Sequence, residues 1–289
     1  MNTKIRRILV PIVFEDYSLN ICKYAIALAE KINAEIKLFH VHKIRSKDEP
    51  FSGYSYQSTE GGGNIDSATK AKNEIEKICN NLREQISEKN IKNINVDYEF
   101  AEGIAVDKIA DMCKEYNPHL VILGTKGEEK KTRALLGTAT TNILEKIKNP
   151  VLAIPQDTIF HDFDNLNVLY ATDFNDSDFS SFNKLLLLLS PFKVKIYCVH
   201  VETSNKLSDE KMETLRSVIK TKYSKYEIQC VLTHSENLFL GIQDFIEDNH
   251  IDMFSFTSPR KSAIQRLFKP DNLKKMFFYT NVPVLVFRA

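Results

Sequence analysis

Three glycines and a threonine between residues 124 and 138 have the residue types and the spacing that bind a phosphate group. Gly124 and Gly127 follow the apolar run 121–123, and after nine more residues Gly137-Thr138 opens a helix-like segment. A glycine lets the backbone approach a bulky anion because no Cβ intervenes. The first N–H groups of a helix lack partners inside the helix and lie at the positive end of its dipole, so they bind phosphates readily. The pattern predicts a site for the phosphates of a nucleotide, although glycines are also typical of purely structural turns.

The composition is that of an ordinary globular chain with one large or two ordinary domains. The 289 residues are 43% apolar and carry a net charge of +1, so they predict a buried core and give no electrostatic reason to expect nucleic acid as a partner. No apolar run has the length of a membrane-spanning helix, and residues 1–7 lack the apolar core of a signal peptide. We therefore expect a cytoplasmic protein that neither spans a membrane nor binds nucleic acid.

The five cysteines form no CxxC pair, so reduced, buried thiols are a better expectation than a zinc cluster or a disulfide framework. His40 and His42 lie two residues apart on a strand-like segment and point to the same face. No third or fourth ligand can be assigned to them, so polar contacts at a strand end are a better interpretation than a metal site.

The chain contains one pattern twice. The apolar run that begins at Ile8 recurs at Val168, and His40 recurs at His200, both at an offset of 160 residues. Further on, Asp111 corresponds to Asp244 at an offset of 133, so the second copy is 27 residues shorter between its second and third strands. A repeat this long predicts two duplicated domains rather than a solenoid. We expect a first domain over 1–155, a linker over 156–165 and a second domain over 166–289.

Each copy alternates strand-like and helix-like segments. In the first copy, short apolar or alternating runs predict strands, and apolar residues at helical spacing predict helices, the first of them with Ser18 as its N-cap. The strands are expected over 7–12, 35–41, 94–100, 120–123 and 151–154, and the helices over 18–32, 67–86, 105–116 and 140–147. Strands that alternate with helices predict right-handed βαβ units. The fold class is therefore α/β, with two tandem, open, doubly wound and mainly parallel five-stranded sheets flanked by helices.

On these residues the chain resembles a tandem universal stress protein. Nucleotide-binding members of that family carry a glycine, two residues, a second glycine, nine residues, then glycine and Ser or Thr, and the first copy matches every fixed position of this motif. The first-strand run 8–11, the strand end 38–41 and the closing run 150–152 also fit the family. The resemblance implies a stress-response protein that binds ATP in its first domain, and whose role is binding more than turnover.

The resemblance also assigns the contacts of the nucleotide. The base would lie near Pro11, Ile12 and Val41, at the carboxyl edge of the sheet. The phosphates would be held by the glycine motif, by the helix start and by loop lysines, and Thr138 could also help to hold a magnesium ion. The residues assigned to the phosphates are Gly124, Lys126, Gly127, Gly137, Thr138 and Ala139.

One position departs from the family pattern. An aspartate that holds the ribose hydroxyls usually follows the first strand, but here that position is Val13, while the second copy keeps Asp173. A lost hydrogen bond costs on the order of 1 kcal/mol, so binding to the first domain would be weakened several-fold. In the second copy Thr257, Arg260, Pro270 and Asp271 replace the three glycines and the threonine, so we expect no nucleotide there.

Three other functions stay open. One is an interaction scaffold without any nucleotide, and another is a slow ATPase, although no side chain can be assigned to position the attacking water. The third is a carrier of a small ligand or metal that uses His234 and His250 of the second domain. The resemblance further implies that the last strands, 151–154 and 284–287, pair edge to edge as an internal pseudo-dimer, and that two chains can associate further.

Overall fold

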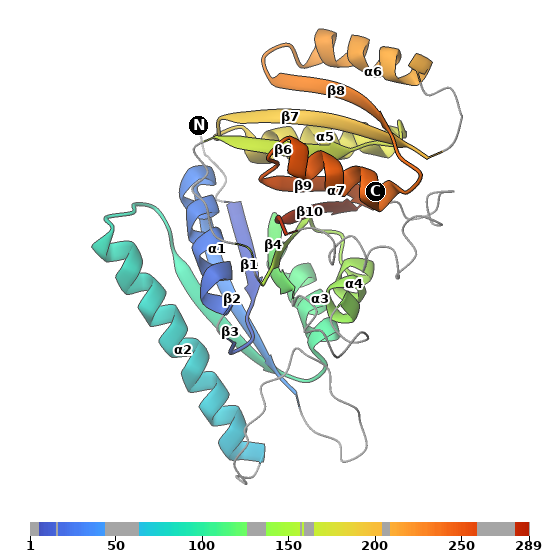
Figure 1. Ribbon diagram of the computed structural model, residues 1–289. Coiled ribbons are helices and arrows are strands. Elements are labelled where there is room, and N and C mark those ends of the chain that lie inside the picture. The colour runs from blue at the N-terminus through green and yellow to red at the C-terminus, as the bar shows by residue number, and fades with distance from the viewer. Residues whose placement is uncertain are drawn as a thin grey trace. The chain divides into compact units, whose positions relative to one another are not determined.

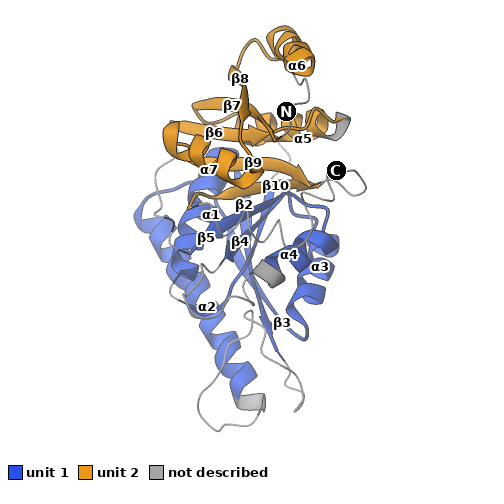
Figure 2. Ribbon diagram, turned by 45° about the vertical axis from the view of Figure 1, so that its right-hand side comes forward, with its two compact units in different colours: residues 1–160 blue, residues 161–289 orange. Residues whose placement is uncertain are grey.

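The computed structural model describes residues 6–15, 17–43, 64–125, 137–156, 158, 165–203, 209–258 and 281–288. The chain divides into two compact units, residues 1–160 and 161–289 (Figure 2). The point of division lies within the segment 156–165 that was expected to join the two copies.

The first unit alternates strands and helices along the chain. Its described strand pairings are all parallel and give the order β3-β2-β1-β4-β5. In Figure 1, α1 and α2 lie on one face of this sheet and α3 and α4 on the other. The predicted open, doubly wound sheet is therefore confirmed. The elements are β1 (Arg6–Pro11), α1 (Ser18–Ile32), β2 (Ala34–His42), α2 (Asn64–Glu88), β3 (Val96–Glu102), α3 (Ala105–Tyr116), β4 (Leu120–Thr125), α4 (Gly137–Lys146) and β5 (Val151–Pro155).

The second unit repeats this topology. Its described strand pairings are also parallel and give the order β8-β7-β6-β9-β10. The helix between its second and third strands has 14 residues where the first unit has 25, which is where the sequence comparison placed the missing residues. The elements are β6 (Leu166–Ala171), α5 (Asp176–Leu189), β7 (Val194–Glu202), α6 (Asp209–Lys222), β8 (Glu227–His234), α7 (Leu238–Asp248), β9 (Met253–Ser258) and β10 (Val284–Arg288).

The helices form where apolar residues recur at helical spacing. In α2 the buried side chains are three or four residues apart, and they lie on one stripe that packs on the sheet. These side chains are Ala71, Ile75, Cys79, Leu82 and Ile86. Helix α1 ends at Asn33, whose left-handed backbone (φ 52°) stops the helix and returns the chain to β2.

One predicted N-cap and one predicted helix start need correction, although the predicted bounds of α1 are confirmed. Ser18 is the first residue of α1 and not its N-cap, because Tyr17 before it already has a helical backbone (φ −71°, ψ −13°). The Ser18 hydroxyl instead donates to the Val13 carbonyl. Helix α4 begins at Gly137, three residues before the predicted start, so the glycine itself belongs to the first turn.

Each unit has its core on both faces of its sheet. Every residue of β4 and of β9 is buried, as expected for central strands covered by helices on two sides. In α5, Leu185, Leu186 and Leu189 are buried whereas Leu187 is 62% exposed, so this leucine run is one face of an amphipathic helix. None of the helices in the described parts of the chain is long and apolar enough to cross a membrane.

Candidate nucleotide-binding site

The carboxyl ends of β1 and β4 lie next to each other in the first unit. Ile8 is paired with Leu120 and Leu9 with Val121, so the strand ends Pro11 and Thr125 reach the same edge of the sheet. The order β3-β2-β1-β4-β5 changes direction between β1 and β4, and ligands of open α/β sheets bind at such a switch point. The structure therefore brings Gly124 close to the segment that follows β1.

The turn after β1 is fixed by its own hydrogen bonds. The Ile12 N–H donates to the Phe39 carbonyl (2.8 Å), and the His40 Nδ1–H donates to the Ile12 carbonyl (2.9 Å). Phe14 stacks on the His40 ring with 4.1 Å between the ring centroids. Because the N–H of Ile12 is engaged in this turn, it is not free to donate to a ligand.

The four residues assigned to base and ribose form apolar surface. Ile12 is 3% exposed, Val13 6% and Val41 5%, and Pro11 is buried with them. The Val13 carbonyl accepts from the Ser18 hydroxyl and from the Glu15 N–H (3.0 Å). This edge of the sheet is therefore apolar, and in the first unit the position of the family aspartate has no polar side chain.

His40 is a positioning residue and carries no charge at neutral pH. Burial lowers the pKa of His40 to about 4, against the opposing effect of its hydrogen bond to Ile12. Its neighbour His42 places Nε2 3.2 Å from the Ser67 hydroxyl of α2. In the parts of the chain that the structure describes, no three His, Cys, Asp or Glu side chains gather as metal ligands, so a metal at this histidine pair has no support from the structure.

Gly124 has a packing role that sequence reasoning missed. A Cβ built on Gly124 would lie 2.4 Å from both Tyr17 Cε2 and Ile21 Cδ1 of α1. These separations are far shorter than a van der Waals contact, so a side chain at residue 124 would force Tyr17 and Ile21 out of their present packing. The glycine was predicted to serve phosphate binding, and the structure gives it a second function on the α1 side of the strand.

The second unit shows the complementary arrangement. Thr257 corresponds to Gly124, and Ser181 of α5 corresponds to Ile21. Compared with the first unit, the second unit therefore has a larger side chain on the strand and a smaller one on the helix. The Thr257 hydroxyl lies 2.8 Å from the Tyr170 hydroxyl, which donates to the Asp178 carbonyl (2.9 Å). This exchange could have been read from the two copies if the partners of each position had been known.

A buried carboxylate organises the turn after β6. Asp178 is 8% exposed and stands where the first unit has Ser18. Its Oδ2 accepts from the Thr172 hydroxyl (3.0 Å) and from the N–H groups of Asp173 (2.9 Å) and Asn175 (3.3 Å). The second unit therefore has a negative charge, already satisfied by its own backbone, at the edge where a base and ribose would lie.

Asp173, which corresponds to Val13, is also engaged within its unit. Its Oδ1 lies 3.6 Å from His200 Nδ1, and burial raises the pKa of this carboxyl while His200 opposes the rise. His200 donates to the Thr172 carbonyl (2.8 Å), as His40 does to Ile12. The duplicated histidine thus holds the same turn in both units.

The structure does not bring together the two histidines of the proposed carrier site. His234 ends β8 and lies 3.4 Å from Glu202, whereas His250 precedes β9. In a parallel sheet the end of one strand and the start of another lie at opposite edges, so the two imidazoles cannot share a ligand.

The other predicted phosphate-binding residues are only partly described. Gly137, Thr138 and Ala139 form the first turn of α4, of which the backbone alone is described. Lys126 and Gly127 lie outside the described residues, as do Arg260, Pro270 and Asp271 of the second unit.

Comparison with known proteins gives consistent results. The model of the universal stress protein family matches residues 4–155. Universal stress protein MJ0531 of Methanocaldococcus jannaschii is 25% identical over 149 residues, which are 52% of this chain and 81% of that protein.

Solved structures resemble the whole chain. A universal stress protein from Archaeoglobus fulgidus has a TM-score of 0.73 and 17% identity, and the match covers 98% of both chains. A functionally unknown protein from Pseudomonas aeruginosa, PA1789, has a TM-score of 0.66 and 15% identity over 98% of this chain and 92% of its own. At these identities the likeness concerns the fold.

Proposed function

The chain belongs to the universal stress protein family, and we propose that it is a cytoplasmic regulatory protein that binds an adenine nucleotide, ATP, in its first unit. Binding, and not turnover, is its main act. The nucleotide would order the loop around Lys126 and change a surface that partner proteins contact.

One observation carries this proposal. The glycine motif leaves β4 at Gly124 and enters α4 at Gly137, at the point where the strand order of the sheet changes direction. Helix α4 has ten residues, and its first turn contains no acidic side chain. Its first N–H groups can therefore take a phosphate without competition from a carboxylate of the same turn.

The apolar residues of the β1 edge support the other end of the ligand. Pro11, Ile12 and Val41 present buried apolar surface next to the end of β4, as a purine ring requires. With Val13 in place of an aspartate, one ribose contact is lost, which costs about 1 kcal/mol or several-fold in affinity.

Calorimetric titration of the full chain with ATP, with and without Mg²⁺, tests the proposal. The proposal is supported if ATP binding is saturable and is lost in Gly137→Val, which places a branched side chain on the first residue of α4. Asp173→Val is the matched control, because it removes the family aspartate from the second unit and should leave ATP binding unchanged. If ATP binding is lost in Asp173→Val and kept in Gly137→Val, the nucleotide binds in the second unit and the proposal is wrong.

A scaffold without nucleotide is the second candidate. It is favoured by Val13, whose side chain is 6% exposed where the family has a ribose-binding aspartate. The same titration decides between the two, since a scaffold gives no heat at millimolar ATP. Steady release of phosphate that disappears in Gly137→Val would instead indicate a slow ATPase.

We further propose that the last strands of the two units serve as association edges. β5 and β10 each stand at the end of the strand order of their own unit, and both are apolar. Edge strands of this kind need cover against aggregation. Hydrogen exchange of the full chain tests this, because pairing predicts slow exchange for every amide of both strands, including those that point away from their own sheet. Size-exclusion chromatography with light scattering reports whether two chains associate further.

A further inference from the structure

Two cysteines that are distant in the sequence lie side by side in the second unit. Cys198 of β7 is the direct register partner of Cys230 of β8. Neighbouring strands are about 4.7–4.9 Å apart, which falls within the 4.4–6.8 Å range of Cα separations in disulfides. Register partners on neighbouring strands carry their side chains on the same face of the sheet, so the two thiols lie side by side.

The two thiols differ in exposure. Cys198 is 2% exposed, whereas Cys230 is partly exposed. The remaining cysteines, Cys22, Cys79 and Cys113, are all buried, and burial raises the pKa of each thiol, to about 12 for Cys22 and Cys113. Of the five cysteines, all of which the structure describes, Cys230 is therefore the one that a solute can reach.

The surroundings of Cys230 favour its thiolate. The hydrogen bond from Cys198 lowers the pKa of Cys230 most, burial opposes this, Arg216 lowers it further and Glu213 raises it. Arg216 of α6 donates from its second terminal nitrogen to the Cys230 carbonyl (3.4 Å) and also pairs with Glu213. A partly exposed thiol beside an arginine is the kind of site at which cysteines react.

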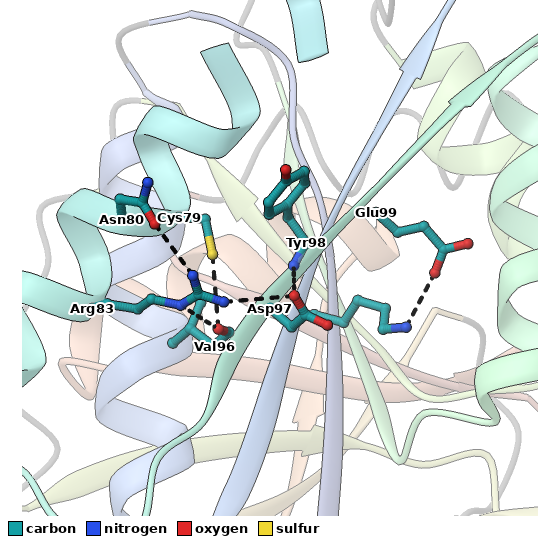
Figure 3. Close-up of polar contacts among 8 residues, drawn as sticks. Cys79, Asn80, Arg83, Val96, Asp97, Tyr98 and Glu99 are labelled. Atoms are coloured by element: carbon teal, nitrogen blue, oxygen red, sulfur yellow. Dashed lines mark hydrogen bonds and ion pairs between the residues drawn. The ribbon is translucent and has the colours of Figure 1, made fainter. Parts of the chain in front are cut away.

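The first unit has a corresponding arginine but no corresponding thiol. Arg216 corresponds to Arg83 at an offset of 133 residues, whereas the strand registers place Cys230 where the first unit has Tyr98. Figure 3 shows Arg83 of α2 reaching β3, where its Nε donates to the Val96 carbonyl (2.8 Å) and its guanidinium lies 3.6 Å from Asp97 Oδ1. In both units the arginine of the helix thus reaches a backbone carbonyl of the edge strand, and in the second unit that carbonyl belongs to Cys230 itself.

The buried thiol also has room to move. A cavity of about 10 Å³ adjoins Cys198 between β7 and the helices α5 and α6, lined by Phe182 and Leu215 among others. Its size is about that of one water molecule. The Cys198 side chain is therefore not close-packed on the side of this cavity.

We propose that Cys198 and Cys230 form a reversible redox site that reacts with hydroperoxides. The Cys230 thiolate attacks one peroxide oxygen, the O–O bond breaks, and a sulfenic acid forms while the other oxygen leaves and takes up a proton. The Cys198 sulfur then attacks the Cys230 sulfur, the S–O bond breaks, and the released hydroxide takes the Cys198 proton to give water. For hydrogen peroxide, two thiols lose two electrons and two protons, and one peroxide becomes two waters.

The test is thiol mapping of the full-length chain by mass spectrometry. The protein is treated with one equivalent of hydrogen peroxide, and free thiols are alkylated before and after denaturation. We expect a linked peptide that contains Cys198 and Cys230 and that dithiothreitol abolishes, while Cys22, Cys79 and Cys113 are alkylated only after denaturation. Oxidation of Cys230 to sulfinic acid without a linked peptide would overturn the proposal, as would unreacted Cys230.

Two variants separate the roles of the neighbours. Arg216→Gln should slow the oxidation about three- to tenfold, since each pKa unit changes the thiolate fraction tenfold near neutral pH. Arg83→Gln, the matched control in the first unit, should leave the rate unchanged. Cys198→Ser should leave a sulfenic acid on Cys230 that dimedone traps. Equal rates in the two arginine variants, or no dimedone adduct in a Cys198→Ser protein with native circular dichroism, would refute the assigned roles.

Discussion

Replacement of Gly124 by alanine is expected to destabilise the first unit by overpacking. The added Cβ would lie 2.4 Å from Tyr17 Cε2, 2.4 Å from Ile21 Cδ1 and 2.9 Å from Tyr17 Cδ2. Ordinary carbon contacts are about 3.5–4.0 Å, so the side chains of α1 would have to shift by about 1 Å. Insertion of a methyl group into a packed core typically costs about 1–3 kcal/mol.

The assay is thermal and urea unfolding of the full chain. For a unit of this size, 1 kcal/mol corresponds to about 2–4 °C in melting temperature. Gly124→Ala should therefore lower the melting temperature of the first unit by about 2–12 °C. Thr257→Ala is the matched variant in the second unit. There a Cβ is already accommodated, so the loss is limited to the hydrogen bond with Tyr170, about 0.5–1.5 kcal/mol.

A double-mutant cycle isolates the clash. Ile21→Val removes the Cδ1 atom that the new Cβ would meet, and alone it should cost about 0.5–1.5 kcal/mol. The double variant should cost less than the sum of the two single changes, although the clash with Tyr17 remains. If the two effects add within about 0.5 kcal/mol, the packing explanation for Gly124 is wrong.

Three further outcomes are expected. His40 has a pKa of about 4 in the folded chain, below its ordinary 6.5, so the neutral ring stabilises the fold fully above pH 6.5 and this contribution is lost as pH falls from 6.5 toward 4. The loss is on the order of 3 kcal/mol, and urea titrations between pH 7 and 4 should show a flatter profile for His40→Gln. Asp178→Ala should lower the unfolding free energy by about 1–3 kcal/mol, because the N–H groups of Asp173 and Asn175 lose their acceptor; an unchanged urea midpoint would contradict this. Val13→Asp should tighten ATP binding several-fold in calorimetry, through about 1 kcal/mol of restored hydrogen bonding; unchanged affinity would show that the ribose is not held at this position.

The fold could be predicted because the same pattern of strands and helices occurs twice in the sequence. The runs that begin at Ile8 and Val168, and the histidines at 40 and 200, recur at one offset and carry the alternation of strand and helix. Local periodicity decides the type of each element, and βαβ handedness leaves few ways to connect parallel strands. The N-cap role of Ser18 was wrong because Tyr17 before it already has a helical backbone, and helix α4 begins at Gly137 and not at residue 140.

The edge that holds the candidate site also followed from the sequence, whereas the reasons for particular residues did not. Gly124 was assigned to phosphate binding alone. Its contact with Tyr17 and Ile21 could not be predicted, because that contact depends on how α1 lies across β4. The pairing of His234 with His250 was wrong because strand direction, and not residue type, places them at opposite edges.

The sequence by itself determined the α/β class, the duplication, the family and the position of the glycine motif, because these depend on local patterns and on the comparison of the two copies. Only the tertiary structure decided that Cys198 faces Cys230, that Asp178 holds the turn after β6 and that Thr257 replaces a glycine against a smaller helix face. Each of these contacts joins elements whose register is set by strand pairing and helix packing across many residues, and no local pattern encodes that register.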